Sequence, residues 1–269
     1  MAPLLLEICI DSFESAVAAI RGGANRLELC AALSEGGLTP SVGLLRELRA
    51  YLAEQNKSTQ VQLYAMIRCR RGSDFRYSEA EMRIMLYDLR LLAENGADGF
   101  VFGALDEMGE IHREHCQQVA SAAGKLPLTF HRAWDCTDRS KMEPNLQLIA
   151  SMGYSTVLTS GFERTALKGI EAISQVVQIA KHISEKTGFN LTIMPGSGVT
   201  PENARMIAEK SLSSAIHASA RSAKNLQLEN NDSTNSKISM GGNNEDDLCL
   251  MVCNEEIVES IKHALELVC

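Results

Sequence analysis

The chain has 269 residues, of which 45% are hydrophobic and 22% are charged, and its net charge at pH 7 is −8. This composition is typical of a globular protein with a sizeable core and excludes a fibrous or disordered chain. No block of Lys and Arg stands out from the acidic background, so we expect neither nucleic acid nor an anionic membrane surface as a partner. No apolar run reaches the roughly 18 residues that a membrane-spanning helix needs, and no membrane partner is expected.

The N-terminal stretch MAPLLLEICID has no positively charged leader, and acidic residues interrupt its apolar run. It therefore reads as mature structure and not as a signal peptide. The eight cysteines are scattered along the chain, with no CxxC pair and no short-loop framework. Such a pattern is typical of free thiols in a reducing compartment, which predicts a cytoplasmic protein.

Short apolar stretches alternate with segments of helical periodicity along most of the chain. The predicted strands span residues 4–10, 26–30, 61–67, 98–102, 127–131, 155–159, 190–195 and 213–219. The predicted helices span 12–22, 41–55, 78–95, 112–123, 139–152, 165–187, 201–210 and 254–268. Eight strand–helix units predict an α/β protein, a (β/α)₈ TIM barrel that forms a single domain over residues 1–269.

An open, doubly wound sheet is the alternative architecture. Its usual dinucleotide cradle is missing, because the first strand-to-helix turn, IDSFESA, contains no GxGxxG. No nucleotide cofactor is therefore indicated. Residues 222–250 form a long, Asn-rich polar insertion between the eighth strand and the last helix. We predict a mobile surface loop there, with an ordered lid over the barrel mouth as the alternative.

The first two strands share a pattern, LEIC and LELC, that places a glutamate and a cysteine on one side of each strand. The helix-facing side of a barrel strand must be apolar, so Glu7, Cys9, Glu28 and Cys30 are predicted to face the lumen. Barrel lumens are usually filled by Val, Ile and Leu, which favours a functional mouth over a structural polar network. A buried carboxylate needs a partner, and we expect Arg68, Arg132 or a histidine.

The two cysteines suggest a metal site. Cys9 and Cys30 are predicted to end neighbouring strands, about 4.8 Å apart, at matching heights. Thiolate and thioether ligands select Cu(I), and Met194 is a further candidate ligand. Structural zinc usually needs four ligands, which the sequence does not supply in short spacing. Buried cysteine is also a common core residue, so simple packing is the alternative.

A second group of residues points to an anionic ligand. Arg68, Arg132 and Arg221 follow three predicted strands and could hold a carboxylate or phosphate, and His131 or a glutamate could exchange protons near neutral pH. The turn PGSG at 195–198 precedes a helix whose N-terminus could bind the same anion, although a plain turn is equally compatible. The candidate anion-binding residues are Gly196, Gly198, His217, Ser219 and Arg221.

The motifs EICIDS, RLELC, LSEGGLTPSVG, MIRCRRGSDFRY, DGFVFGAL, TFHRAWD, LTSG, MPGSG and HASAR, in this order, resemble the CutC copper homeostasis family over residues 4–221. The resemblance implies a TIM barrel that is cytoplasmic, in animal members also nuclear, forms a homo-oligomer (dimer or tetramer) and binds Cu(I). The family's proposed copper cysteines correspond to Cys9 and Cys30. Its mouth residues correspond to Glu7, Glu28, Arg68, His131, Arg132, Met194, His217, Ser219 and Arg221. Cys69, Arg71 and Ser197 depart from the family's usual residues, which puts the shape of their loops in doubt.

Two hypotheses of function follow. The first is a copper homeostasis protein that binds Cu(I) through Cys9 and Cys30 at the mouth of the barrel. The second is an enzyme acting on a small phosphorylated or carboxylated metabolite. In that case the catalytic candidates are Glu7, Glu28, Arg68, His131 and Arg132. The sequence leaves open whether the protein has catalytic turnover.

Overall fold

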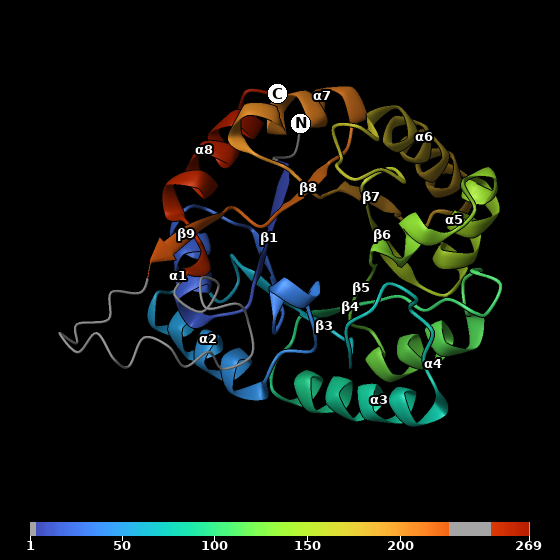
Figure 1. Cartoon of the computed structure of the whole chain (residues 1–269), viewed down its shortest axis with the longest axis horizontal. Helices are drawn as coiled ribbons and strands as arrows, with labels where there is room; N and C mark the ends of the chain where they lie inside the picture. The colour runs from blue at the N-terminus through green and yellow to red at the C-terminus, as the bar shows by residue number, and fades with distance from the viewer. Residues whose placement is uncertain (1–3, 226–248, 269) are drawn as a thin grey trace, which may run out of the picture.

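The computed structural model describes residues 4–225 and 249–268. Eight parallel strands lie in the order β7-β6-β5-β4-β3-β2-β1-β8 and form a nearly closed barrel (Figure 1). These strands are β1 Leu5–Ile10, β2 Arg26–Leu29, β3 Gln62–Met66, β4 Gly99–Phe102, β5 Leu128–Phe130, β6 Tyr154–Thr159, β7 Thr192–Pro195 and β8 Ala215–Ala218. Each lies within the predicted stretch or one residue outside it, and the predicted TIM barrel is confirmed.

Helices form a ring around the strands (Figure 1). They are α1 Phe13–Arg21, α2 Val42–Glu54, α3 Glu79–Glu94, α4 Arg113–Ala123, α5 Met142–Ser151, α6 Ile170–Thr187, α7 Pro201–Ser211 and α8 Glu255–Glu266. Several begin where a hydroxyl or amide side chain caps them, as Ser12, Ser41 and Asn254 do for α1, α2 and α8. Among the helices of the described ranges, none has the length and apolar character to cross a membrane.

The barrel closes between β7 and β8. The backbone ladder joins β8 to β1 through Leu5↔Ala215 and Glu7↔His217, whereas no ladder joins β7 to β8 within the described residues. The hydroxyl of Ser213, just before β8, instead donates to the carbonyl of Ile193 on β7. A side-chain hydrogen bond thus helps to close the seam.

Side chains of the strands separate into an outer and an inner layer, as their alternation predicts. Leu6, Ile8, Leu27 and Leu29 belong to the large apolar core beneath the helices. The lumen holds smaller apolar clusters. One consists of Cys30, Tyr64, Met66 and Val101, and the other of Leu158, Met194 and Ala215. Glu7, Cys9 and Glu28 are on the lumen side of their strands, so their predicted inward orientation is confirmed.

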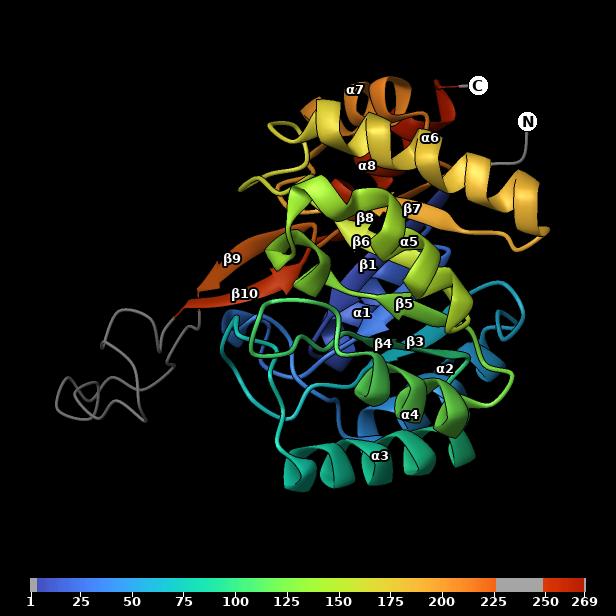
Figure 2. The ribbon, with the colours of Figure 1, turned by 90° about the vertical axis from the view of Figure 1, so that its right-hand side faces the viewer.

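Two further strands were not predicted. β9 Arg221–Asn225 and β10 Cys249–Cys253 pair in antiparallel fashion and form a ribbon that projects from one side of the barrel (Figure 2). The Cys253 N–H donates to Ser15 Oγ on α1 at 3.1 Å, which ties the ribbon to the barrel. The prediction of a loop over 222–250 was therefore wrong at both ends. Its central part, 226–248, lies outside the described residues. The apolar run LCLMVC at 248–253 is the signal that could have predicted β10.

Candidate functional site

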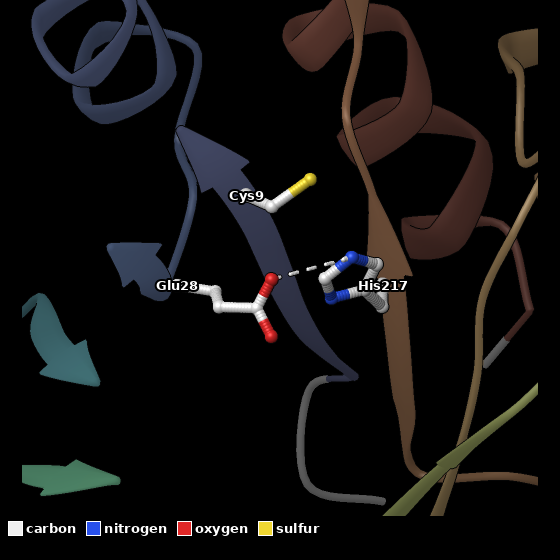
Figure 3. Close-up of side chains that lie close together, drawn as sticks. All are labelled: Cys9, Glu28 and His217. Atoms are coloured by element: carbon white, nitrogen blue, oxygen red, sulfur yellow. Dashed lines mark ion pairs between the residues drawn. The ribbon is translucent and has the colours of Figure 1, made fainter. Parts of the chain in front are cut away.

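Three neighbouring strands, β2, β1 and β8, bring a thiol, a carboxylate and an imidazole together at the mouth of the barrel. The register pairs Cys9 with Glu28 and Glu7 with His217. One ligand atom each of Cys9, Glu28 and His217 lies within 4.8 Å of the other two, and all three residues are buried (Figure 3). A thiol, a carboxylate and an imidazole are all metal-binding groups, so this cluster is the candidate metal centre of the described residues.

The predicted matching heights of Cys9 and Cys30 were wrong. Cys9 lies opposite Glu28, and Cys30 is two residues further along its strand. The Cys30 thiol donates to Glu28 Oε2 at 3.6 Å, and burial together with the Glu28 charge raises the pKa of Cys30 well above its usual value. The strands of a barrel are staggered relative to one another, so equal positions in two sequence repeats need not lie at equal heights.

Glu7 has two charged partners inside the barrel. Arg26 Nε donates to one carboxylate oxygen at 2.5 Å, and His217 Nδ1 lies 2.7 Å from the other. Burial acts to raise the pKa of Glu7, but attraction to Arg26 and the contact with His217 outweigh it and hold this pKa at about 2. The predicted histidine partner is confirmed. The arginine is Arg26, and neither Arg68 nor Arg132. Its inward position in RLELC was the available signal.

Glu28 is nearly as buried as Glu7 but has weaker partners. His217 Nε2 lies 4.0 Å from Glu28 Oε2, and Glu28 Oε1 has no hydrogen-bond partner among the described residues. Burial, with repulsion from Glu7, raises the pKa of Glu28 to about 7. Burial disfavours charge on His217, but attraction from Cys9 and Glu28 raises its pKa well above the usual value. The cluster therefore combines a carboxyl group that titrates near neutrality with an imidazole that holds a proton.

A cavity of about 920 Å³ opens over this cluster. Its walls come from the loops that follow the strands and from the first turn of α7. Most of the predicted site residues line it, namely Cys9, Glu28, Arg68, His131, Arg132, Gly198, His217, Ser219 and Arg221. Glu7, Cys30 and Gly196 lie outside its lining. The cavity thus gathers side chains from β1, β2 and β8 and from the segments after β3, β5 and β7.

Arg68, which follows β3, is 5% exposed, and within the described residues its guanidinium donates only to backbone carbonyls. Its Nη1 donates to the carbonyls of Glu35 and Gly37, and its Nη2 donates to the carbonyl of Gly72. No carboxylate of the described residues lies within ion-pair distance of Arg68, and its Nε has no partner. The guanidinium therefore joins two loops of the mouth while its charge stays without a counter-ion.

His131 ends β5, and its hydrogen bonding fixes the form of the ring. The Ala133 N–H donates to His131 Nδ1 at 3.2 Å. Burial and the nearby charge of Arg68 lower the pKa of His131 to about 3, so the ring is neutral at physiological pH. Because Nδ1 accepts, the proton of the neutral ring is on Nε2, which has no partner among the described residues.

Asp135 was not chosen as a site residue from the sequence, because surface solvation is the default for such a carboxylate, although it could orient an arginine. It accepts hydrogen bonds from Arg132 Nε at 2.8 Å, from the hydroxyls of Thr159 and Ser160, and from the Phe162 N–H. Arg132 Nη2 also donates to Ser160 Oγ at 2.7 Å. Asp135 thereby joins the loop after β5 to the loop after β6. The spacing of Arg132 and Asp135 in HRAWD was the only signal in the sequence.

The glycines of PGSG have structural roles in the described chain. The Gly196 N–H donates to the Thr159 carbonyl at 2.9 Å, and a Cβ on Gly196 would lie 2.7 Å from Leu158 Cδ1. Thr200 and Asn203 form a reciprocal cap at the start of α7. The amide of Gly196 is thus committed to the barrel and not offered to a ligand. An anion-binding role for Gly196 and Gly198 stays a prediction.

Strained backbone is concentrated at the mouth. Five non-glycine residues with positive φ lie in the loops that follow strands, at Ala32, Phe75, Phe162, Ser197 and Ala220. The two others in the described ranges, Asn56 and Leu212, follow helices. Left-handed φ is unfavourable for residues with a Cβ, and such strain gathers at functional sites. This distribution supports placing the functional site at the mouth.

The fold and the site define a (β/α)₈ barrel with a buried, ionisable cluster beneath a cavity at the C-terminal ends of its strands. Residues 4–222 match the model of the CutC family. The copper homeostasis protein cutC homolog of Drosophila melanogaster is 45% identical over 215 residues, which cover 80% of this chain and 76% of that protein. The Homo sapiens homolog is 41% identical over 237 residues, 88% of this chain and 80% of that protein.

A solved structure of a copper homeostasis protein CutC from Streptococcus agalactiae has the same architecture. It is 29% identical, with a TM-score of 0.72, and the match covers 80% of this chain and 98% of that one. The chain belongs to the CutC family. The sequence resemblance is thereby confirmed.

Proposed function

We propose that this protein binds Cu(I) at the mouth of its barrel, with Cys9 Sγ and His217 Nε2 as the principal ligands. The observation that carries the proposal is the approach of Cys9, Glu28 and His217 to within 4.8 Å of one another in a buried cluster. The copper homeostasis names of the family's relatives support copper as the ion. Copper is the cargo in this proposal.

The contact made by Nδ1, the nitrogen of His217 that does not bind metal in this proposal, supports the role of Nε2 as a ligand. Nδ1 lies 2.7 Å from Glu7 Oε1, and this contact fixes the ring so that Nε2 faces Glu28 (Figure 3). Metal-binding histidines usually hold their outer ring nitrogen against a carboxylate or carbonyl in this way. Glu7 is itself held by Arg26, so the orientation of His217 depends on a buried network and not on one flexible side chain.

The donor atoms fit a soft ion. A thiolate and an imidazole suit Cu(I), whereas a carboxylate oxygen is a hard donor that suits other ions better. We therefore assign Glu28 the role of proton acceptor, because a thiol and a protonated imidazole must each lose a proton to bind metal. Zn²⁺ with Cys, His and carboxylate ligands and one open position is the competing occupant that an experiment must distinguish.

Cys30 is a secondary candidate ligand in this proposal. Its thiol is 1% exposed and donates to Glu28, so it must break that bond and lose a raised-pKa proton before it can bind an ion. Binding by both Cys9 and Cys30 therefore needs rearrangement of Glu28, and binding by Cys9 and His217 does not. A cytoplasmic location belongs to the proposal, because thiols stay reduced there. Nuclear localisation and a homo-oligomer, dimer or tetramer, stay predictions.

The test is Cu(I) affinity measured without oxygen by competition with a chromogenic Cu(I) chelator. Cys9→Ser and His217→Gln should each weaken Cu(I) binding by more than roughly 10–100-fold, which is the usual effect of removing a residue that orients a ligand but does not touch the metal. Cys30→Ser should weaken it less. Cys136→Ser is the control, because Cys136 is an exposed thiol on the 3₁₀ helix Arg132–Cys136 and should contribute nothing. Full Cu(I) affinity in Cys9→Ser would refute the proposal.

A further inference from the structure

The mouth cavity is larger than a metal ion requires. At about 920 Å³ it falls in the range of roughly 300–1,000 Å³ that is typical of sites for small organic ligands. Cys9, Glu28 and His217 account for only part of its lining. The remaining polar groups come from the segments after β2, β3, β5, β7 and β8, and they have not been given a role in copper binding.

Two of these groups are arginines without acidic partners. Arg68 is 5% exposed and contacts three backbone carbonyls but no carboxylate of the described residues. Arg221, the first residue of β9, also forms no ion pair with the described residues, and its buried Nε has no hydrogen-bond partner. By contrast, Arg132 on the same cavity is paired with Asp135. A buried cation without a counter-ion is costly, and a bound anion removes that cost.

The strand order places the two arginines on either side of the metal cluster. Arg68 follows β3, and Arg221 follows β8, whereas β2 and β1 between them carry Glu28 and Cys9. Both arginines line the same cavity. An anion held by either of them therefore lies in the chamber of the cluster but does not use its ligands.

His131 adds a neutral donor to this side of the cavity. Nδ1 accepts the Ala133 N–H, so the ring proton is on Nε2, which has no acceptor in the part of the chain that the structure describes. The Phe75 ring lies close to both His131 and Arg68, with its centroid 4.9 Å from that of His131 and 5.5 Å from Arg68 Cζ. Phe75 has a left-handed φ of 51°. Phe75 is thus a strained aromatic residue close to two N–H groups, Arg68 Nε and His131 Nε2, that have no acceptor among the described residues.

The start of α7 is a poorer anion site, although it also lines the cavity. Thr200 and Asn203 already cap the helix, and residue 201 is a proline without an N–H. Glu202 in the first turn places a negative charge there. The helix N-terminus is therefore not the donor that we assign to an anion, although Arg221 follows β8 and so belongs to the usual phosphate region of such barrels.

We infer that the mouth cavity binds a small organic anion, a carboxylate or phosphate ester, whose oxygens are held by Arg68, Arg221 and the Nε2–H of His131. This inference extends beyond copper binding and does not depend on it. Such a site is also what the alternative hypothesis of an enzyme acting on a phosphorylated or carboxylated metabolite requires. The forked guanidinium suits both oxyanions, and the experiment distinguishes them.

The test is calorimetry on metal-free protein with three probes, inorganic phosphate, glycerol 3-phosphate and malonate, and with glycerol as the uncharged control. At least one anion should bind saturably with a Kd of about 1 mM or tighter, and glycerol should not. A preference for glycerol 3-phosphate assigns the site to phosphate esters, and a preference for malonate assigns it to carboxylates. Absence of saturable binding by all three anions overturns the inference.

Variants locate the site. Arg221→Gln and His131→Asn should each weaken binding of the preferred anion by at least about 10-fold, since each removes one direct donor. Asparagine at 131 can still accept the Ala133 N–H and keep the local turn. Arg205→Gln is the control, because Arg205 pairs with Glu209 on the exposed surface of α7. Arg68→Lys keeps the positive charge but loses the forked guanidinium, and it should also weaken binding of the preferred anion.

Two outcomes of the variant series are decisive. Equal affinity in the wild type, Arg221→Gln and His131→Asn shows that the anion binds elsewhere and overturns the inference. Cys9→Ser should retain anion binding, and the same variant should lose Cu(I) binding. Failure of one proposal is therefore distinguishable from failure of the other.

Discussion

His217 and Glu7 are partners on adjacent strands, with Nδ1 of the imidazole 2.7 Å from a carboxylate oxygen. The same carboxylate accepts from Arg26, whose guanidinium also lies 4.3 Å from the centre of the Tyr64 ring. The position of the candidate ligand His217 is thus set by a carboxylate that itself contacts no metal in our proposal. The first prediction below concerns the pair of Glu7 with Arg26, and the second concerns His217 as a copper ligand.

Glu7→Gln should destabilise the protein by about 3 kcal/mol or more, because it leaves the buried charge of Arg26 without its counter-ion. The free energy of unfolding from chemical denaturation measures this effect. Glu259→Gln is the control, since Glu259 is exposed on α8, and it should change stability by less than about 0.5 kcal/mol. Equal stability of the wild type and Glu7→Gln would show that the pair with Arg26 contributes little.

The Cu(I) complex should contain one sulfur and one nitrogen donor at short distance in X-ray absorption spectra. This pattern is expected because Cys9 and His217 already lie close together, whereas the Cys30 thiol donates a hydrogen bond to Glu28. Cys30→Ser should leave the spectrum unchanged. A spectrum with two sulfur donors that becomes one in Cys30→Ser would contradict the assignment and would favour the pair of cysteines predicted from the sequence.

The pKa of His131 predicts a dependence of stability on pH. Burial and Arg68 lower this pKa from 6.5 to about 3, so the folded state binds the proton less readily than the unfolded state. Stability should therefore be fully present above pH 6.5 and fall as the pH decreases toward 3, by about 1.4 kcal/mol per pH unit from this group. The folded-state pKa of Glu7, about 2 against 4.5, adds a loss only below about pH 4.5.

Denaturation of the wild type and His131→Asn between pH 7 and 4.5 isolates the contribution of His131. The variant should lose less stability over this range, because asparagine does not titrate. Parallel curves for the two proteins would mean that the imidazole accepts its proton freely in the folded state. His115, whose pKa burial also lowers, is present in both proteins and cancels in the comparison.

Asp135→Asn should loosen the two loops that this carboxylate joins. The change removes the negative charge and converts one of the two acceptor oxygens, which serve Thr159 on one side and Arg132 with Ser160 on the other, into a donor, and we expect a loss of about 2–3 kcal/mol, since hydrogen bonds to charged groups are strong. Amide hydrogen exchange at 159–163 should accelerate. Asp138→Asn provides the comparison, because Asp138 is an exposed cap whose amide analogue still accepts the Ser140 N–H. Unchanged exchange in Asp135→Asn would contradict this role.

Gly196→Ala and Gly43→Ala should shift stability in opposite directions. A Cβ on Gly196 would lie 2.7 Å from Leu158 Cδ1 and 3.2 Å from His217 Cβ, so we expect a loss of about 1–3 kcal/mol. A Cβ on Gly43, in α2, would meet nothing closer than 3.8 Å, and alanine should stabilise that helix by up to about 1 kcal/mol. Thermal denaturation compares the two variants. A neutral Gly196→Ala would show that Leu158 yields readily.

The barrel could be predicted because the two-residue alternation of its strands and the helical period of the segments between them were both strong. LLLEICI alternates so that Leu6 and Ile8 face helices while Glu7 and Cys9 face inward, and the structure confirms this division. The predicted helix starts at 12 and 41 fall on the serines that cap α1 and α2. Local chemistry of this kind is visible in a single sequence, since it depends on residues that are close together in the chain.

The partners across the barrel could not be predicted in the same way. Alternation states which side of a strand a residue occupies, but the stagger between strands decides its height, so Cys9 meets Glu28 and not Cys30. The pairing of Glu7 with Arg26 depends on the same stagger. Asp135 was left outside the predicted site for another reason. Its donors at 159–162 are distant in sequence, and a carboxylate in a loop is usually solvated.

The seam between β7 and β8 has a consequence for the metal cluster. β8 is held by a backbone ladder to β1 alone, and β1 is in turn laddered to β2. Only side-chain hydrogen bonds of the described residues cross the seam region, since Ser213 Oγ donates to the Ile193 carbonyl and Arg26 Nη2 donates to Met194 Sδ at 3.3 Å. The thiol, the carboxylate and the imidazole therefore lie on one uninterrupted run of backbone ladders, and their mutual spacing does not depend on how the seam is closed.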